Sequence, residues 1–165
     1  MHLTAHARYD ADLDRVVRML ADEGFVETKV RASGAVSQQV DVVGTADEAF
    51  TVTTRRQMPT DQIPAQFRSL VGATLEVRQV EAWEAPTPGE RRGTVVVEIV
   101  GVPVRMTGTL RLEPTAEGGT VQHVDADLKA SIPLFAAAVE QETARALEAA
   151  IAAEERSGQA WLARG

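Results

Sequence analysis

Apolar residues recur at every second position through much of the stretch from residue 36 to residue 130, and after Pro133 they recur at helical spacing instead. Alternation places apolar side chains on one face of a strand, whereas the later spacing places them along one side of a helix. A sheet with one apolar face is stable only when a second layer covers that face. The pattern therefore predicts an α+β fold in which antiparallel strands pack against one long C-terminal helix.

Short turns that contain glycine or proline separate the strands. The predicted strands cover residues 3–8, 36–42, 50–56, 75–83, 92–100, 104–112 and 121–130. A two-residue turn at Gly101 and Val102 places Val97 opposite Met106 on the buried face of the sheet. We therefore expect a curved antiparallel sheet of six to seven strands.

Two short helices are predicted between the first and second strands. After Asp10 as the N-cap, one helical stripe is formed by Leu13, Val16, Val17 and Leu20. The second helix covers Phe25 to about Ala32, and Gly34 ends it. A further short helix is predicted near residues 63–71, where Pro64 suits a first helical position.

The last helix begins near Pro133 and runs to about Arg156 or further. On a helical wheel its apolar arc contains Phe135, Val139, Ala146, Ala150 and Ala153, and it is flanked by Leu147 and Ile151. Glu142 lies inside this arc and interrupts it. No linker or change of composition divides the chain, so a single domain over residues 1–165 is expected.

The charge balance excludes some classes of partner. The chain has 24 acidic and 17 basic residues and a net charge of −7, so it lacks the clustered cations that a nucleic-acid surface needs. No stretch reaches the 18 or so apolar residues of an integral membrane segment. With no cysteine and much alanine and arginine, the sequence favours a bacterial cytoplasmic protein.

None of the common catalytic motifs occurs in the sequence. His123 alternates with Asp125 and Asp127 on a strand, but residues two apart on a strand rarely chelate one ion. His2 and His6 lie near one terminus and are too far apart for a shared metal. We therefore expect neither a metal nor another cofactor, and no catalytic residue is assigned.

Several polar residues share the face of the strands that is predicted to be concave. These residues are Gln38, Arg56, Gln79 and Glu81, and the helical residue Glu142 is predicted to face them. A buried carboxylate needs a counter-ion, water or a ligand. Glu142 either reaches water at the helix edge, forms a structural ion pair, or faces a ligand with a raised pKa.

Three segments carry a resemblance to a known family: HARYDADLDRVVRMLADEGFVETK, IPAQFRSLVG and LKASIPLFAAAVEQE. Together with the order of elements they resemble the START-like superfamily, which is also called the polyketide cyclase, SRPBCC or Bet v 1-like superfamily. At finer grain the chain is similar to the DUF2505 family, although Ala136 and Ala137 stand where that family usually has glycines. The resemblance implies a helix-grip fold and an apolar ligand held between sheet and helix.

Three functions are compatible with this sequence. The first is a carrier or binder of an apolar small molecule or lipid, because small Val and Ala side chains can leave a cavity. The alternative is a structural or interaction module with a packed core that docks through its Ala-rich helix, Trp161 or Leu162. The third is a cyclase- or dehydratase-like enzyme in which Arg56, Glu81 or Glu142 moves protons.

The candidate ligand-binding residues are those that the predicted phases turn toward the interior. They are Phe50, Val52, Arg56, Val77, Trp83, Val97, Met106, Leu110, Phe135, Val139 and Glu142. Neither the ligand nor the oligomeric state follows from the sequence.

Overall fold

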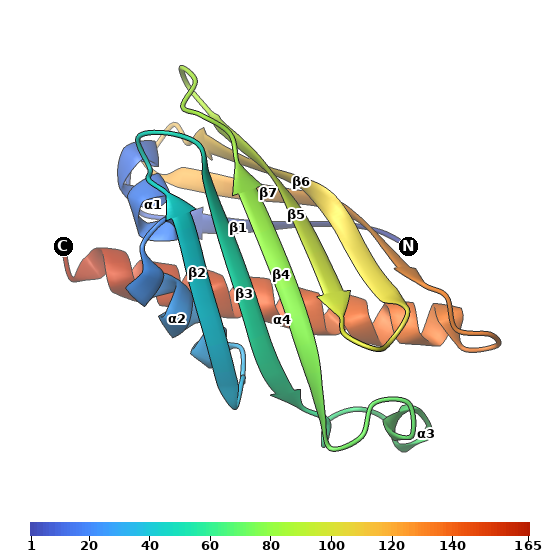
Figure 1. The fold of residues 1–165 in the computed structure, drawn as a ribbon. Coiled ribbons are helices and arrows are strands. Elements are labelled where there is room, and N and C mark those ends of the chain that lie inside the picture. The colour runs from blue at the N-terminus through green and yellow to red at the C-terminus, as the bar shows by residue number, and fades with distance from the viewer.

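The computed structural model describes residues 1–165 and shows a seven-stranded antiparallel sheet around a long C-terminal helix (Figure 1). The strands lie in the order β1-β7-β6-β5-β4-β3-β2. The strands are β1 (His2–Tyr9), β2 (Ser37–Gly44), β3 (Phe50–Pro59), β4 (Thr74–Trp83), β5 (Arg91–Ile99), β6 (Val104–Pro114) and β7 (Thr120–Ala130). The helices are α1 (Leu13–Leu20), α2 (Glu23–Ala32), α3 (Ala65–Arg68) and α4 (Ala136–Ala163). The predicted α+β helix-grip fold is confirmed.

The β5–β6 hairpin has the predicted register. Val97 pairs with Met106 on the inner face, and Glu98 pairs with Arg105 on the outer face, where the two side chains form an ion pair. Gly101 turns the chain with a φ of 78°, a left-handed conformation that glycine adopts without strain. The apolar alternation and this turn together fix which side chains of β5 and β6 face the interior.

The helices α1 and α2 close one end of the sheet (Figure 1). The predicted N-cap Asp10 is wrong, because the Asp12 side chain accepts the N–H of Arg15 and thereby caps α1. Asp22 caps α2 in the same way by accepting the N–H of Phe25. Gly34, with a φ of 97°, turns the chain after α2 as predicted.

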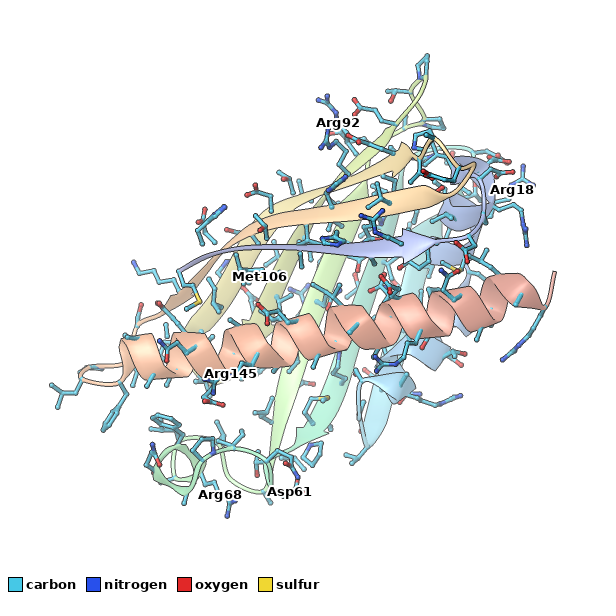
Figure 2. The ribbon with its side chains drawn as sticks, turned by 180° about the vertical axis from the view of Figure 1, so that it is seen from behind. Arg18, Asp61, Arg68, Arg92, Met106 and Arg145 are labelled. Atoms are coloured by element: carbon cyan, nitrogen blue, oxygen red, sulfur yellow. The ribbon has the colours of Figure 1, made fainter.

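The helix α4 begins three residues after Pro133, and its rotation differs from the predicted one. Leu147 and Ile151, which were predicted only to flank the apolar arc, face the sheet together with Ala150, whereas Ala146 is exposed. Glu142 lies on the outer side and pairs with Arg145 at 2.5 Å, and Figure 2 shows Arg145 pointing away from the sheet. The prediction was wrong because it counted alanines, which gain little from burial, equally with the large apolar side chains.

Most of the fully buried residues of α4 lie in its C-terminal half. There Trp161 contacts Phe25 edge to face with ring centroids 5.7 Å apart, and Leu162 is buried. The backbone of α4 approaches α2, β1 and β7 most closely. Between α4 and strands β3 to β6, only side chains fill the interior, and the candidate site lies in this region.

Candidate functional site

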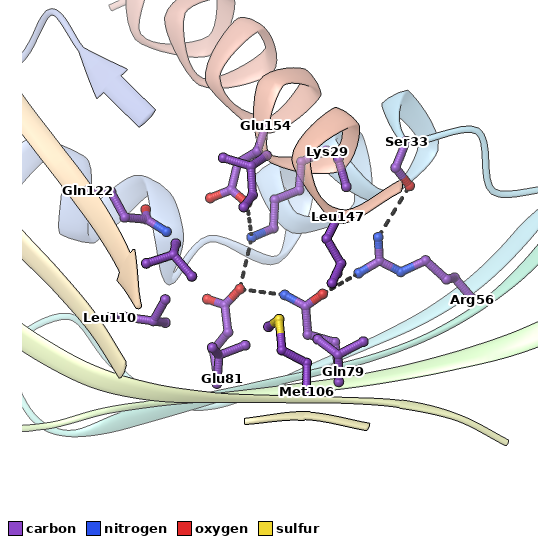
Figure 3. A pocket seen from close by; sticks show the side chains of 15 residues that line it. Lys29, Ser33, Arg56, Gln79, Glu81, Met106, Leu110, Gln122, Leu147 and Glu154 are labelled. Carbon is purple, nitrogen blue, oxygen red and sulfur yellow. Dashed lines mark hydrogen bonds and ion pairs between the residues drawn. The ribbon is translucent and has the colours of Figure 1, made fainter. Parts of the chain in front are cut away.

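A cavity of about 60 Å³ lies between the sheet and α4 (Figure 3). One part of its wall is apolar and consists of Val95, Val97, Met106, Leu110, Val124, Leu147, Ala150 and Ile151. The rest of the wall is polar and consists of Lys29, Ser33, Arg56, Gln79, Glu81, Gln122 and Glu154. The cavity is therefore amphipathic and contains four ionisable side chains.

Lys29 connects α2 to both carboxylates of the site. It belongs to the buried face of α2, and its Nζ lies 3.4 Å from Glu81 Oε1 and 3.2 Å from Glu154 Oε2. Burial alone would lower the pKa of Lys29, but the Glu154 and Glu81 carboxylates outweigh burial and hold this pKa above its usual value of 10.5. Lys29 is therefore a stable cation at neutral pH.

Glu81 has more hydrogen-bond donors around its carboxylate than Glu154 has. The period of two in β4 turns Gln79, Glu81 and Trp83 to the same inner face. Gln79 Nε2 donates to Glu81 Oε1 at 2.7 Å, and Trp83 Nε1 donates to Glu81 Oε2 at 3.3 Å. With Lys29 as a third donor, the buried carboxylate is well compensated.

Glu154 reaches into the site from α4. Its Oε1 accepts a hydrogen bond of 3.3 Å from the hydroxyl of the buried residue Tyr9. Burial, and then the neighbouring Glu154 carboxylate, raise the pKa of the Tyr9 hydroxyl well above 10.0. Glu154 thus joins β1, α2 and α4 through one side chain.

Arg56 differs from Lys29 because its direct partners are neutral. It donates to Ser33 Oγ at 3.2 Å, Thr54 Oγ1 at 3.4 Å and Gln79 Oε1 at 2.8 Å. Its Nε is buried and has no hydrogen-bond partner. Burial lowers the pKa of Arg56, and the Glu81 and Glu154 carboxylates oppose this lowering only in part.

A second buried polar atom without a partner lies across the cavity. Gln122 is 4% exposed, and its Oε1 accepts no hydrogen bond. Figure 3 shows Gln122 and Arg56 on opposite sides of the cavity, with Glu81 and Gln79 between them. Buried polar atoms are nearly always paired with protein, water or a ligand, so these two atoms have hydrogen-bonding capacity that the protein itself does not use.

Four of the predicted site residues line the cavity: Arg56, Val97, Met106 and Leu110. Figure 2 shows Met106 between the sheet and α4. Phe50, Val52 and Trp83 are buried beside the cavity but do not line it, and the Phe50 and Trp83 rings stack with centroids 6.2 Å apart. Val77 is half-buried on the inner face of the sheet.

The other three predicted residues lie outside the cavity. Phe135 is 45% exposed and contacts Phe67 of α3 with ring centroids 5.8 Å apart. Val139 is half-buried one turn further along α4. Glu142 is on the surface with Arg145, so the proposed acid–base role for Glu142, which required it to face the cavity, has no geometric basis.

Four polar residues of the site were not predicted from the sequence: Lys29, Ser33, Gln122 and Glu154. Lys29 occupies a helical position between the apolar residues Val26 and Val30 of the buried face of α2, a signal that was available in the spacing. Glu154 lies seven residues after Leu147 and shares its side of α4, which only the correct rotation of the helix would have shown.

Outside the cavity, no three His, Asp or Glu side chains are arranged to hold a metal ion. His2 pairs with Asp127 at 3.2 Å and with Asp125 at 3.6 Å on the outer face of the sheet. No helix has the length and hydropathy needed to cross a membrane.

Comparison with solved structures shows which known fold the chain shares. A Thermus thermophilus protein, TTHA0849, superimposes with a TM-score of 0.64 and 17% identity, covering 97% of this chain and 98% of that chain. A START superfamily protein from Mycobacterium smegmatis superimposes with a TM-score of 0.56 and 12% identity, covering 93% and 94%. The chain therefore has the helix-grip fold of the START-like superfamily.

The family follows from the sequence match. Residues 4–162 match the family described as protein of unknown function (DUF2505), and the chain belongs to this family. The uncharacterized protein Rv0481c of Mycobacterium tuberculosis (strain H37Rv) is 24% identical over 162 residues, covering 94% of this chain and 93% of the relative. The uncharacterized protein Mb0491c of Mycobacterium bovis matches to the same extent.

Proposed function

We propose that this protein binds a small molecule with an apolar body in the space between the sheet and α4. The observation that carries this proposal is a cavity in which an apolar wall adjoins two buried polar atoms, Arg56 Nε and Gln122 Oε1, that have no protein partner. A few convergent polar groups in a mostly apolar pocket are typical of small-molecule sites. The site of action that we propose is the cytoplasm, with which the lack of cysteine is compatible.

The cavity must widen when such a ligand binds. Its volume of about 60 Å³ is enough for only a few water molecules. Ligand pockets usually measure about 300–1,000 Å³. The half-buried side chains of Val77, Ile99 and Leu147 extend the apolar wall toward solvent. The accessible surface of 8700 Å² also exceeds the roughly 7,900 Å² typical of a 17.7 kDa chain, as an incompletely closed interior would produce.

The geometry favours binding over the other two functions. The interaction hypothesis relied on the Ala-rich helix, Trp161 or Leu162. Trp161 packs on Phe25 and Leu162 is buried, so only the exposed alanines of α4 remain for docking. Proton transfer needs an acid or base that is free to react, whereas Glu81 and Glu154 both accept hydrogen bonds from several buried donors. These contacts hold the two carboxylates in fixed positions, as is expected of the polar end of a binding site.

A matched pair of substitutions on α4 tests this proposal. Ala150 lines the cavity and the adjacent Ala149 is exposed, so Ala150→Phe fills the cavity while Ala149→Phe adds the same ring to the surface. The neutral dye N-phenyl-1-naphthylamine fluoresces in apolar surroundings and reports binding. We expect Ala150→Phe to weaken its binding about tenfold or more, which corresponds to about 1.4 kcal/mol, and Ala149→Phe to leave binding within about twofold.

Circular dichroism and thermal unfolding of both variants show whether they keep the fold. The proposal fails if the wild-type protein does not bind the dye, or if folded Ala150→Phe binds it as tightly as Ala149→Phe does.

A further inference from the structure

The charged side chains of the cavity form two groups, and the two groups differ in the sign of their net charge. Both carboxylates, Glu81 and Glu154, contact Lys29 directly. Arg56 has no carboxylate among its hydrogen-bond partners and reaches Glu81 only through the Gln79 amide, which accepts from Arg56 and donates to Glu81. The Lys29 cluster therefore has an excess of negative charge, and the Arg56 end is positive.

The guanidinium of Arg56 has bonding capacity that the protein does not use. Arg56 is 8% exposed and lines the cavity, yet its Nε–H has no acceptor. A guanidinium carries five N–H donors in a planar fork, and the edge formed by Nε and a neighbouring Nη matches the two oxygens of a carboxylate. Neutral acceptors now occupy the Nη atoms, and a charged acceptor forms stronger hydrogen bonds than these do.

The register of the sheet places apolar side chains beside Arg56. Arg56 pairs with Val77 across β3 and β4, and Val77 pairs with Ile99 across β4 and β5. In the next inward-facing row, Val97 and Met106 follow Gln79. A molecule with its head at Arg56 can thus lay an apolar body along these four side chains and under Leu147 of α4 (Figure 3).

We propose that Arg56 binds the carboxylate of an organic acid whose apolar body lies between the sheet and α4. This inference rests on the binding function proposed above and specifies the chemical class of its ligand. The carboxylate accepts the Nε–H and one Nη–H of Arg56, while Gln79 keeps Glu81 at a distance from the bound anion. Lys29 remains paired with the carboxylates of Glu81 and Glu154.

Two competitors that differ in the head group test this inference. Octanoate and octan-1-ol share an eight-carbon chain, and each can displace the neutral dye N-phenyl-1-naphthylamine from the protein. We expect octanoate to displace the dye from the wild-type protein at a concentration about tenfold or more below that of octan-1-ol, although water solvates the carboxylate better. Arg56→Gln should abolish this preference, so that octanoate and octan-1-ol displace the dye at similar concentrations.

Two further variants separate binding from a structural role of Arg56. Arg145→Gln makes the same substitution at an exposed arginine of α4 and should leave the preference for octanoate unchanged. Arg56→Lys retains the charge but lacks the planar fork, so it should retain only part of the preference.

Each outcome has a distinct meaning. The inference is overturned if wild-type protein binds octanoate no better than octan-1-ol, or if folded Arg56→Gln lowers the affinities for octanoate, octan-1-ol and the dye equally, because Arg56 would then only support the fold. If the dye and both competitors fail to bind wild-type protein, the binding function itself is wrong. Dye binding without a preference for octanoate would leave the binding function intact and reject only the acid.

Discussion

Replacing Lys29 by Met is expected to lower the free energy of unfolding by about 3–5 kcal/mol. The side chains of Lys29 and Glu81 are both 6% exposed, and Glu154 also points into the interior. Without Lys29, two buried carboxylates would face each other with no cation in contact, and an uncompensated buried charge is strongly destabilising. Urea unfolding monitored by circular dichroism measures the change.

Two controls identify the cause of this loss. The chain has one other lysine, the exposed Lys129, and Lys129→Met should change the free energy of unfolding by less than about 0.5 kcal/mol. The triple variant Lys29→Met, Glu81→Gln, Glu154→Gln removes the stranded charges and should regain at least half of the lost stability. A triple variant as unstable as the single one would mean that packing around Lys29, and not its charge, is what matters.

The pH dependence follows from the raised pKa of Lys29. Because this pKa is higher in the folded state than the usual 10.5, the stabilisation from the proton on Lys29 is fully present below about pH 10.5 and is lost as the pH rises above that value. The difference in stability between wild type and Lys29→Met should thus shrink as the pH rises above 10.5. Tyr9 also has a raised pKa, so the comparison is best made in a Tyr9→Phe background.

Replacing Gly158 of α4 by Val is expected to cost about 3 kcal/mol. A Cβ atom at Gly158 would lie 2.4 Å from Cε1 and 2.9 Å from Cδ1 of Tyr9, and 3.2 Å from Cε of Met19. The Tyr9 ring is buried and its hydroxyl is held by Glu154, so it cannot move aside easily. Glycine at this position lets α4 approach β1 closely and brings Glu154 into the site.

The control for this prediction is Ala152→Val on the exposed side of the same helix, which should cost less than about 1 kcal/mol. Combining Gly158→Val with Tyr9→Ala gives the new side chain the space of the removed ring. The double variant should therefore be more stable than the sum of the two single effects predicts. Additive effects in thermal or urea unfolding would show that contact with Tyr9 is not the reason for glycine at this position.

The parts of the site that follow from strand alternation could be predicted from the sequence. A strand turns every second side chain to one face, so the inward positions of Arg56, Gln79 and Glu81 followed once the strands were located. The pairing of Val97 with Met106 across β5 and β6 followed from the two-residue turn predicted at Gly101 and Val102. Most of the sheet could be derived in this way, because register and phase are local properties of the sequence.

The helical part of the site could not be predicted in the same way. Alanine is compatible with either side of a helix, so the Ala-rich sequence of α4 did not define its rotation, and Glu142 was placed inside while Glu154 was missed. Lys29 was missed because a charged residue in an apolar stripe looks like an interruption until its two carboxylate partners are known. Those partners come from β4 and α4, far away in the sequence, and only the tertiary fold brings them together.

The most direct test of the binding function is a crystal structure of the protein soaked with 1-bromonaphthalene, a neutral apolar molecule whose bromine is located by anomalous scattering. We predict a bromine peak between Val97 and Met106 of the sheet and Leu147 of α4, with α4 displaced outward relative to the structure described above. Bromine peaks confined to the surface, with the interior cavity still at about 60 Å³, would contradict the proposed binding function.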